Sequence, residues 1–185
     1  MPTEPMKVLF VCTGNICRSP VAERMLQQRG SQHGLDLVVS SAGTRALNGM
    51  DMHPESVRVL QERGIDPKGF TSRLLTPKLT ADADLILGLS REHRAAARQL
   101  APVRWRDMFA LREIAAGGEV FGSGFEDRPA PTIFEGPNDR GLDIKDPIGR
   151  SAEVFDSVAE DIEATMGGLV AWIEHQFVGA TTFNK

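Results

Sequence analysis

The feature that most restricts how this chain can fold is a short apolar run that ends at a cysteine and is followed by a helix-forming pattern. Residues 8–11 (Val-Leu-Phe-Val) are typical of a buried strand, and amphipathic spacing begins at Pro20. Between them lies the octapeptide Cys-Thr-Gly-Asn-Ile-Cys-Arg-Ser of residues 12–19. The Cys12 thiol is therefore expected at the carboxyl end of a strand, in a loop whose backbone N–H groups converge on one anion at a helix N-terminus.

Strand-like and helix-like segments alternate along the chain. We expect strands at residues 7–11, 35–41, 84–89 and 103–108, helices at 20–32, 54–63, 91–100 and 151–176, and a helical turn at 111–116. This alternation predicts an α/β fold with a mostly parallel sheet covered by helices on both faces. Ligands of such sheets bind outside the carboxyl ends of the strands, which is where Cys12 is expected.

The composition indicates one globular domain spanning residues 1–185 and argues against several classes of protein. A net charge of -4 gives no support for binding to nucleic acid or to an anionic membrane surface. No apolar stretch approaches the roughly 20 residues that span a bilayer, and the chain does not start with the basic segment of a signal peptide. The 2 cysteines make no disulfide framework, so we expect a reducing, cytoplasmic location.

One segment interrupts the alternation of strands and helices. Residues 117–143 are rich in glycine, proline and acidic side chains, and a loop of this length in a compact domain is either functional or disordered. Such a composition indicates a solvated surface more often than a recognition element. We therefore predict a Gly/Pro-rich loop insertion within the single domain.

The octapeptide carries the groups that phosphoryl transfer to a cysteine requires. A cation and a helix N-terminus lower the pKa of a cysteine thiol, and Arg18 supplies a planar guanidinium that matches two phosphate oxygens. Gly14 permits a backbone geometry closed to other residues, and Asn15 tolerates a left-handed conformation and can hydrogen-bond across the loop. Ser19 suits the N-cap of the following helix, although its hydroxyl could instead donate to the Cys12 sulfur. We predict that Cys12 is a catalytic nucleophile.

A phosphoryl transfer to cysteine also needs a general acid that protonates the leaving oxygen. Asp146 stands out among the 25 acidic residues, because it follows the long loop, precedes the last helix and is stiffened by Pro147. Asp143 is the nearest competitor and has no rigid neighbour. The spacing alone leaves both candidates open.

Three stretches of the sequence resemble the low-molecular-weight protein tyrosine phosphatases. Residues 8–22 are similar to the opening of that family, residues 40–44 (Ser-Ser-Ala-Gly-Thr) to its second-strand signature, and Asp146-Pro147 to its late acid loop. The resemblance implies a three-layer fold with a four-stranded parallel sheet and a P-loop at the carboxyl end of the first strand. It also implies a two-step hydrolysis of phosphotyrosine that uses no metal and no cofactor.

The resemblance further implies a role for each residue of the site. Cys12 would attack phosphorus, Arg18 would hold the phosphoryl oxygens, and Asp146 would protonate the leaving phenolate and then activate water. The phosphate-binding loop would comprise Thr13, Gly14, Asn15, Ile16, Cys17, Arg18 and Ser19. Within it, Asn15 and Ser19 would organise the loop, with Ser41 supporting Asn15. Cys17 would form a reversible disulfide with Cys12 that protects it from overoxidation, or would simply pack behind the loop.

The departures from the family concern the substrate more than the reaction. The residue after Asp-Pro is often aromatic in the family and is Ile148 here, the opposite wall at residues 46–48 has no aromatic, and Phe70 stands where relatives often carry histidine. We expect a phosphatase of phosphotyrosine-bearing proteins, such as a bacterial tyrosine kinase or its target. A phosphatase or binding module for another phosphoester is the alternative. An arsenate reductase that relays electrons is disfavoured, because no cysteine follows Cys17.

Overall fold

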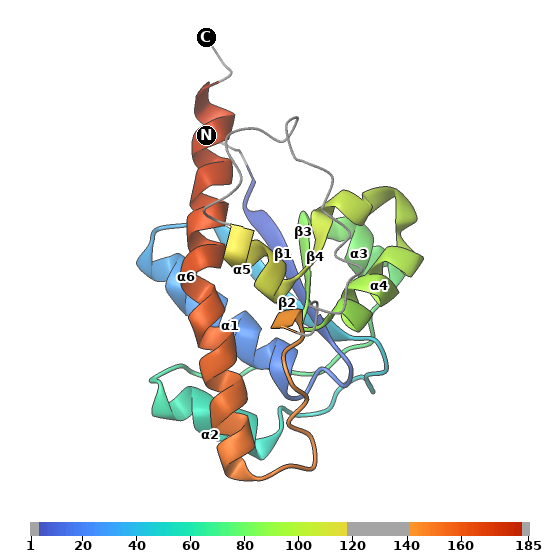
Figure 1. Cartoon of the computed structure of the whole chain (residues 1–185), viewed down its shortest axis with the longest axis vertical. Coiled ribbons are helices and arrows are strands. Elements are labelled where there is room, and N and C mark those ends of the chain that lie inside the picture. The colour runs from blue at the N-terminus through green and yellow to red at the C-terminus, as the bar shows by residue number, and fades with distance from the viewer. Residues whose placement is uncertain (1–3, 118–140, 183–185) are drawn as a thin grey trace.

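The computed structural model describes residues 4–117 and 141–182 of the 185-residue chain (Figure 1). Most of the loop predicted at residues 117–143 lies outside the described residues, so the insertion stays a prediction. The described residues form the predicted α/β fold, with strands and helices alternating along the chain.

Four parallel strands form one sheet in the order β2-β1-β3-β4. The strands are β1 (Met6–Cys12), β2 (Leu37–Gly43), β3 (Leu85–Gly88) and β4 (Met108–Ala110). The central strands β1 and β3 are buried over most or all of their length, which explains the unbroken apolar runs that predict them. The four-stranded parallel sheet is therefore confirmed.

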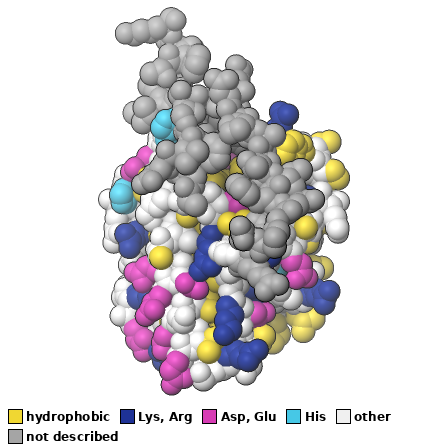
Figure 2. Space-filling model, viewed as in Figure 1, with side chains coloured by type: hydrophobic (Ala, Val, Ile, Leu, Met, Phe, Trp, Pro, Cys, Tyr) yellow, Lys and Arg dark blue, Asp and Glu magenta, His cyan; other side chains and the backbone are white. Residues whose placement is uncertain are grey.

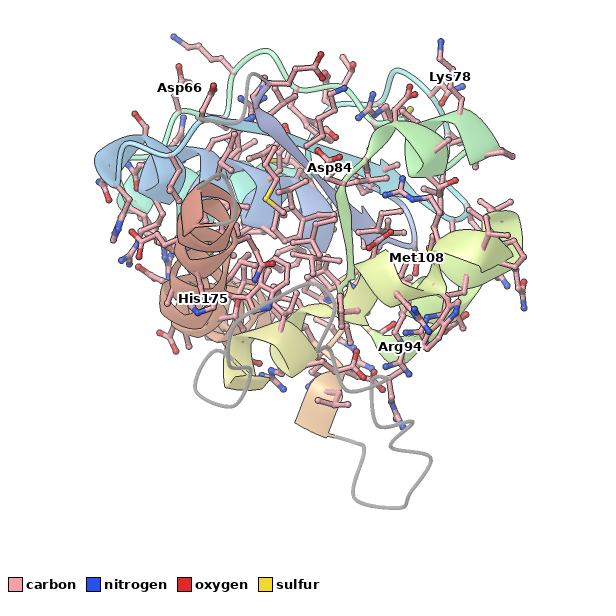
Figure 3. The ribbon with its side chains drawn as sticks, turned by 90° about the horizontal axis from the view of Figure 1, so that it is seen from above. Asp66, Lys78, Asp84, Arg94, Met108 and His175 are labelled. Carbon is pink, nitrogen blue, oxygen red and sulfur yellow. The ribbon has the colours of Figure 1, made fainter. Side chains whose placement is uncertain are left out.

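Helices cover both faces of this sheet and complete the three layers (Figure 3). One face is covered by α1 (Arg18–Gln32), α2 (Pro54–Glu62), α5 (Leu111–Gly117) and α6 (Ala152–Thr182), and the other by α3 (Pro77–Asp82) and α4 (Arg91–Leu100). Alternate side chains of β1 divide between the two cores. Phe10 and Cys12 lie in the larger core with α1 and α6, whereas Leu9 and Val11 lie in the smaller core with α4. The Cys12 side chain therefore faces the α1 side.

The order of the strands determines where a ligand site can form. After β1 the chain passes through α1 to β2 on one side, whereas β3 lies on the other side of β1 and leads into α4 on the opposite face. The loops after β1 and β3 therefore diverge at neighbouring strand ends, and this point is the usual ligand site of open parallel sheets. The octapeptide begins there because Cys12 is the last residue of β1.

The strand predicted at residues 103–108 is largely wrong, because most of it forms the 3-10 helix η1 (Pro102–Asp107) and only the short β4 follows. Polar and apolar residues alternate there, but the apolar side chains do not form a buried face. Val103 is 91% exposed, and the Trp105 ring packs against the guanidinium group of Arg106. The short helix α3 likewise has no counterpart among the predicted elements.

The longest helix, α6, runs through its Gly167-Gly168 pair without interruption. A Cβ at Gly168 would clash with the backbone of Ala115 in α5. Gly168 therefore lets α5 and α6 pack closely on the same face of the sheet.

The surface carries charges of both signs. Figure 2 shows acidic side chains gathered over α2 and the beginning of α6, with lysine and arginine side chains interspersed, in keeping with the net charge of -4. Within the part of the chain that the structure describes, no helix is long and apolar enough to cross a membrane.

Candidate active site

The octapeptide forms a tight loop around the Cys12 sulfur. Cys12 ends β1, and α1 begins at Arg18. The chain turns at Asn15, whose φ of 54° is left-handed, and the Asn15 backbone N–H donates to the Cys12 sulfur over 3.2 Å. Gly14 is not left-handed, and a Cβ there would make an ordinary contact at 3.6 Å. The left-handed conformation predicted for Asn15 is therefore confirmed, whereas Gly14 takes no left-handed conformation.

Ser19 contacts the sulfur and does not cap the helix. The predicted N-cap is wrong, because α1 starts at Arg18, two residues before the predicted start, and Cys17 stands at the N-cap position without a side-chain bond. The Ser19 hydroxyl lies 2.9 Å from the Cys12 sulfur and accepts a hydrogen bond from the Asn15 side-chain amide. Because the Asn15 amide uses only one acceptor site of the Ser19 oxygen, the Ser19 hydroxyl can still donate its proton to the sulfur. The Cys12 sulfur thus has two hydrogen-bonding partners from its own loop, the Asn15 N–H and the Ser19 hydroxyl.

Behind the loop, a chain of hydrogen bonds leads from Asn15 to a buried carboxylate. Asn15 Nδ2 donates to Ser41 Oγ over 2.9 Å, and the Ser41 hydroxyl donates to Glu23 Oε2 over 2.5 Å. We call Asn15, Ser19, Ser41 and Glu23 the buried support, since none is more than 8% exposed. Burial raises the pKa of Glu23, and the Ser41 hydrogen bond opposes this rise only in part. The structure thus brings Ser41 to Asn15 and adds Glu23, which the sequence does not single out.

Two further residues hold the back of the loop. Arg73 donates its backbone N–H to Asn15 Oδ1 over 2.9 Å and its Nε to the Ser41 carbonyl over 2.8 Å. A Cβ at Gly43 would lie 2.5 Å from the Thr13 carbonyl oxygen and 2.9 Å from the Asn15 nitrogen, so only glycine fits at the end of β2. The Ser-Ala-Gly-Thr signature marks Gly43 in the sequence, but no local pattern marks Arg73.

Arg18 joins the loop to the segment that precedes α6. Its nearly buried side chain donates from Nη1 to the Ile144 carbonyl and from Nη2 to Asp146 Oδ2, both over 2.9 Å. Nη2 also approaches Thr13 Oγ1 at 3.5 Å. The bond from Arg18 holds Asp146 beside the loop, although the two residues are 128 positions apart in the sequence. The Asp146 side chain is 42% exposed. The structure therefore gathers Cys12, Arg18 and Asp146 at one edge of the sheet.

The competing acid, Asp143, is engaged elsewhere. It accepts hydrogen bonds from the backbone N–H, Nε and Nη2 of Arg91 at the start of α4. Although burial raises the pKa of Asp143, these bonds and the Arg91 charge hold it below its usual range. A carboxyl group held in its ionised form is a poor proton donor at neutral pH. Of the two candidates, Asp146 is the one that contacts Arg18.

Cys17 is a buried thiol in the same loop. Burial, followed by the negative charges of Cys12 and Asp146, raises the pKa of Cys17 to about 12, so its thiol is neutral at physiological pH. Both cysteines are free in the structure. The packing role and the redox role of Cys17 are compatible with this position, and its pairing with Cys12 stays a prediction.

The exposed side of the site carries aliphatic side chains beside the polar Arg45, Asn48 and Asp51. Segment 44–53 is tied to the loop because the backbone N–H groups of Thr44, Arg45 and His53 donate to the carbonyls of Cys12, Thr13 and Ile16 at 2.9, 2.9 and 2.8 Å. This segment exposes Leu47 and Met50, and Ile148 follows the acid loop; the three are 71%, 49% and 49% exposed. We call Leu47, Met50 and Ile148 the rim. Phe70 packs against the larger core and contributes no polar group to the site.

No group of three or more histidine, cysteine and acidic side chains within residues 4–117 and 141–182 could hold a metal ion. The groups gathered at this edge are a thiol, a guanidinium, a carboxyl group and backbone amides. Such a set can bind an oxyanion and transfer it through sulfur.

Comparison with known proteins agrees with this geometry. The family model of the low molecular weight phosphotyrosine protein phosphatases matches residues 7–118. A low molecular weight protein-tyrosine-phosphatase of Streptomyces coelicolor is 31% identical over 94% of this chain and 96% of its own. A protein-arginine-phosphatase of Bacillus subtilis is 31% identical over 85% of this chain and 90% of its own.

A solved structure extends the match to the fold. The arginine phosphatase YwlE, in a Cys-to-Ser mutant with a phosphorylated active site serine, superposes with a TM-score of 0.74 at 27% identity. The superposition covers 91% of this chain and 96% of that one. The chain therefore belongs to the low molecular weight phosphotyrosine protein phosphatase family, whose members are hydrolases.

Proposed function

We propose that the protein is a cysteine-dependent phosphatase that hydrolyses phosphotyrosine in proteins through a phosphocysteine intermediate. The observation that carries this proposal is the contact between Arg18 and Asp146 at 2.9 Å beside a sulfur that receives the Asn15 N–H. The reaction needs a nucleophile, a group that binds phosphate and a proton donor. Cys12, Arg18 and Asp146 can supply these three roles at one place, although Asp146 is far from the other two in the sequence.

In the first step, the phosphoryl dianion enters the loop and competes with Asp146 for Arg18 Nη2. The backbone amides of residues 13–18 and the Arg18 guanidinium hold the equatorial oxygens. The Cys12 sulfur attacks phosphorus opposite the leaving oxygen, so the S–P bond forms as the P–O bond breaks. Asp146 gives its proton to the departing phenolate, and the products are phosphocysteine and a free tyrosine hydroxyl.

In the second step, the same carboxylate acts as a base. Asp146 takes a proton from water, the water oxygen attacks phosphorus, and the S–P bond breaks to release inorganic phosphate. The Ser19 hydroxyl, 2.9 Å from the sulfur, donates to the thiolate as it leaves. Cys12 returns to its starting state, which requires no cofactor.

The rim favours an aryl phosphate over a phosphoguanidinium group. A guanidinium seeks a free carboxylate, whereas Asp146 and Asp143 are paired with Arg18 and Arg91, which leaves the exposed Asp51 as the acidic side chain of segment 44–53. The rim and the half-buried Ile16 instead offer aliphatic surface, against which a tyrosine ring can be buried. Aromatic stacking, about 0.5–1.5 kcal/mol in other sites, is missing here, so the ring is bound less tightly than by an aromatic wall.

Phosphoarginine is the second candidate substrate, because one relative is a protein-arginine-phosphatase at 31% identity. Electron relay to arsenate has no such support: the chain holds 2 cysteines, and both lie in the loop. The partner class that follows is a protein with exposed phosphotyrosine, such as a bacterial tyrosine kinase or its target, and the expected location is the cytoplasm.

The deciding experiment compares one peptide sequence carrying phosphotyrosine, phosphoarginine or phosphoserine. We expect kcat/KM for phosphotyrosine to exceed the other two by at least about tenfold, and C12A to lose turnover of all three. Faster hydrolysis of phosphoarginine would reassign the substrate while leaving the reaction intact. Turnover by C12A would contradict the cysteine mechanism itself.

A further inference from the structure

One buried titratable group reaches the loop from the opposite face of the sheet. His93, in the first turn of α4, is 2% exposed, and both ring nitrogens have a hydroxyl partner. Nδ1 lies 2.8 Å from Ser90 Oγ, and Nε2 lies 2.9 Å from Thr13 Oγ1. The first contact is local to the start of α4, whereas the second joins residues 80 positions apart in the sequence.

The fold brings His93 to Thr13 through the neighbouring ends of β1 and β3. A Cβ at Gly88 would lie 2.7 Å from the Ser90 carbonyl oxygen, so this glycine lets the first turn of α4 pack onto the end of β3. The Leu89 N–H donates to the Val11 carbonyl over 2.8 Å, which fixes that end against β1 one residue before the loop. The ring is therefore held from two sides at the loop.

Thr13 connects the His93 ring to Arg18, the residue proposed to bind the phosphoryl group. Its Oγ1 is 3.5 Å from Arg18 Nη2, the same nitrogen that donates to Asp146. An imidazole, a hydroxyl, a guanidinium and a carboxylate thus follow one another from His93 to Asp146. Because a hydroxyl has one donor and two acceptor sites, Thr13 can bond to His93 and Arg18 together in either tautomer of a neutral ring.

The charge state of the ring suits this connection. Burial, followed by the positive charge of Arg18, lowers the pKa of His93 to about 4, although Asp146 and Asp143 oppose the shift. The ring is therefore neutral at physiological pH and adds no cation beside Arg18. It keeps one donor and one acceptor, and so acts through hydrogen bonds.

We propose that His93 is a positioning residue of the phosphatase reaction, which acts through the Thr13 hydroxyl to hold Arg18 in the orientation that grips the transferring phosphoryl group. The inference rests on the proposed function, because that function assigns the phosphoryl group to Arg18. The competing role is a local one, in which the ring only supports the Ser90 cap of α4.

Two substitutions separate these roles, because each keeps one nitrogen position of the ring. Asparagine places its amide near Nδ1 and keeps the Ser90 bond, whereas glutamine reaches the Nε2 position and keeps the Thr13 bond. With p-nitrophenyl phosphate, we expect H93N to lower kcat about 10- to 100-fold with KM changed less than about threefold. H93Q should retain at least about a third of kcat, since the Thr13 bond persists.

Thr13 provides the second half of the test. T13V removes the hydroxyl at nearly constant shape and should lower kcat as H93N does. If the ring acts through this hydroxyl, the double variant H93N/T13V should lose no more than about twofold beyond T13V alone. H33N is the matched control, because His33 is exposed and pairs with Glu174 in α6, and its kcat should stay at the wild-type value.

Equal losses in H93N and H93Q, or additive losses in the double variant, would overturn the proposal. If H93N unfolds at the assay temperature, T13V and H93Q decide: the proposal requires kcat to fall in the first and to persist in the second. Failure of the proposed function has a different signature. In that case the wild type would not hydrolyse p-nitrophenyl phosphate, or C12A would hydrolyse it equally well.

Discussion

The two sides of the loop after β1 are built in opposite ways. Behind it, the buried support is at most 8% exposed and is joined by hydrogen bonds of 2.5 to 2.9 Å. In front of it, the rim consists of three aliphatic side chains that are 49% to 71% exposed. A buried polar group left without its partner costs about 1–3 kcal/mol, whereas exposed substitutions usually change stability by about 0.5 kcal/mol or less.

This difference separates the reaction from the choice of substrate. The buried support fixes the shape of an oxyanion cradle that serves any phosphoryl group. In the proposed function the rim is where a substrate side chain makes its contacts, and its exposed residues can change without disturbing the fold. Asp146 lies between the two regions, since Arg18 holds it while 42% of its side chain is exposed. Substitutions should therefore affect chemistry, stability or affinity according to which side they touch.

The largest effect is expected for D146A. Removal of a general acid costs about 10²- to 10⁴-fold, and we expect this loss in kcat/KM for phenyl phosphate, whose leaving group needs a proton. Phosphates of acidic phenols should lose about tenfold or less. The measurement is kcat/KM, which reports the steps up to the phosphoenzyme, across a series of aryl phosphates of increasing phenol pKa. D143A is the matched control and should keep the wild-type dependence, whereas an equal loss across the series in D146A would remove it as the acid.

A smaller effect on turnover is expected for N15A, which breaks the buried support. The variant removes the donors to Ser19 and Ser41 and the left-handed residue of the loop, so kcat should fall about 10- to 100-fold and the free energy of unfolding by about 1–3 kcal/mol. N48A is the control on the exposed side, because Asn48 accepts the Leu74 N–H. Equal losses of kcat in N15A and N48A would contradict the claim that the buried support, and not the exposed side, determines turnover.

E23Q should change the pH dependence of stability more than it changes turnover. Burial raises the pKa of Glu23 above its ordinary 4.5, so the native state prefers the protonated carboxyl group. That contribution to stability is complete below the unfolded pKa and is lost as pH rises through the raised native pKa. In E23Q the loss should disappear, with kcat within about twofold because the amide oxygen still accepts from Ser41. Parallel unfolding curves for E23Q and wild type from about pH 4 to about pH 8 would refute this.

The smallest effect is expected at the rim. I148Y supplies the missing ring, and an aromatic pair worth about 0.5–1.5 kcal/mol should lower KM for a phosphotyrosine peptide about twofold to tenfold. Its kcat and its thermal midpoint should stay at the wild-type values. V103Y is the matched control, because Val103 is 91% exposed on η1 and should leave KM unchanged. A fall in kcat for I148Y would place Ile148 in the chemistry and not in recognition.

The sequence predicts the parts of the fold that local patterns dictate. β1 and α4 appear where their apolar spacing and their flanking residues place them, and α4 has the predicted bounds of Arg91–Leu100. The strand expected at residues 103–108 fails because alternation specifies a strand only when one face is buried. The loop of residues 117–143 lies mostly outside the described residues.

The candidate site divides in the same way. Asn15 and Ser19 are predictable because their role is set within the octapeptide, although the N-cap prediction for Ser19 gives way to its contact with sulfur. Glu23 and Arg73 are not predictable, since each looks like an ordinary charged residue until packing against β2 places it behind the loop. His93 carries a weak signal, as one of 4 histidines, five residues after the end of β3 and three after the helix-capping Ser90.

The central claim is that phosphate passes through sulfur, and trapping the phosphorylated enzyme tests it most directly. Rapid acid quenching with a radiolabelled phosphate of an acidic phenol, which departs without the Asp146 proton, followed by peptide mapping, locates the label. We expect label on the Cys12 peptide within one turnover in the wild type, a larger fraction in D146A because the second step lacks its base, and none in C12A. Label on any other residue, or turnover without label on Cys12, would contradict the mechanism.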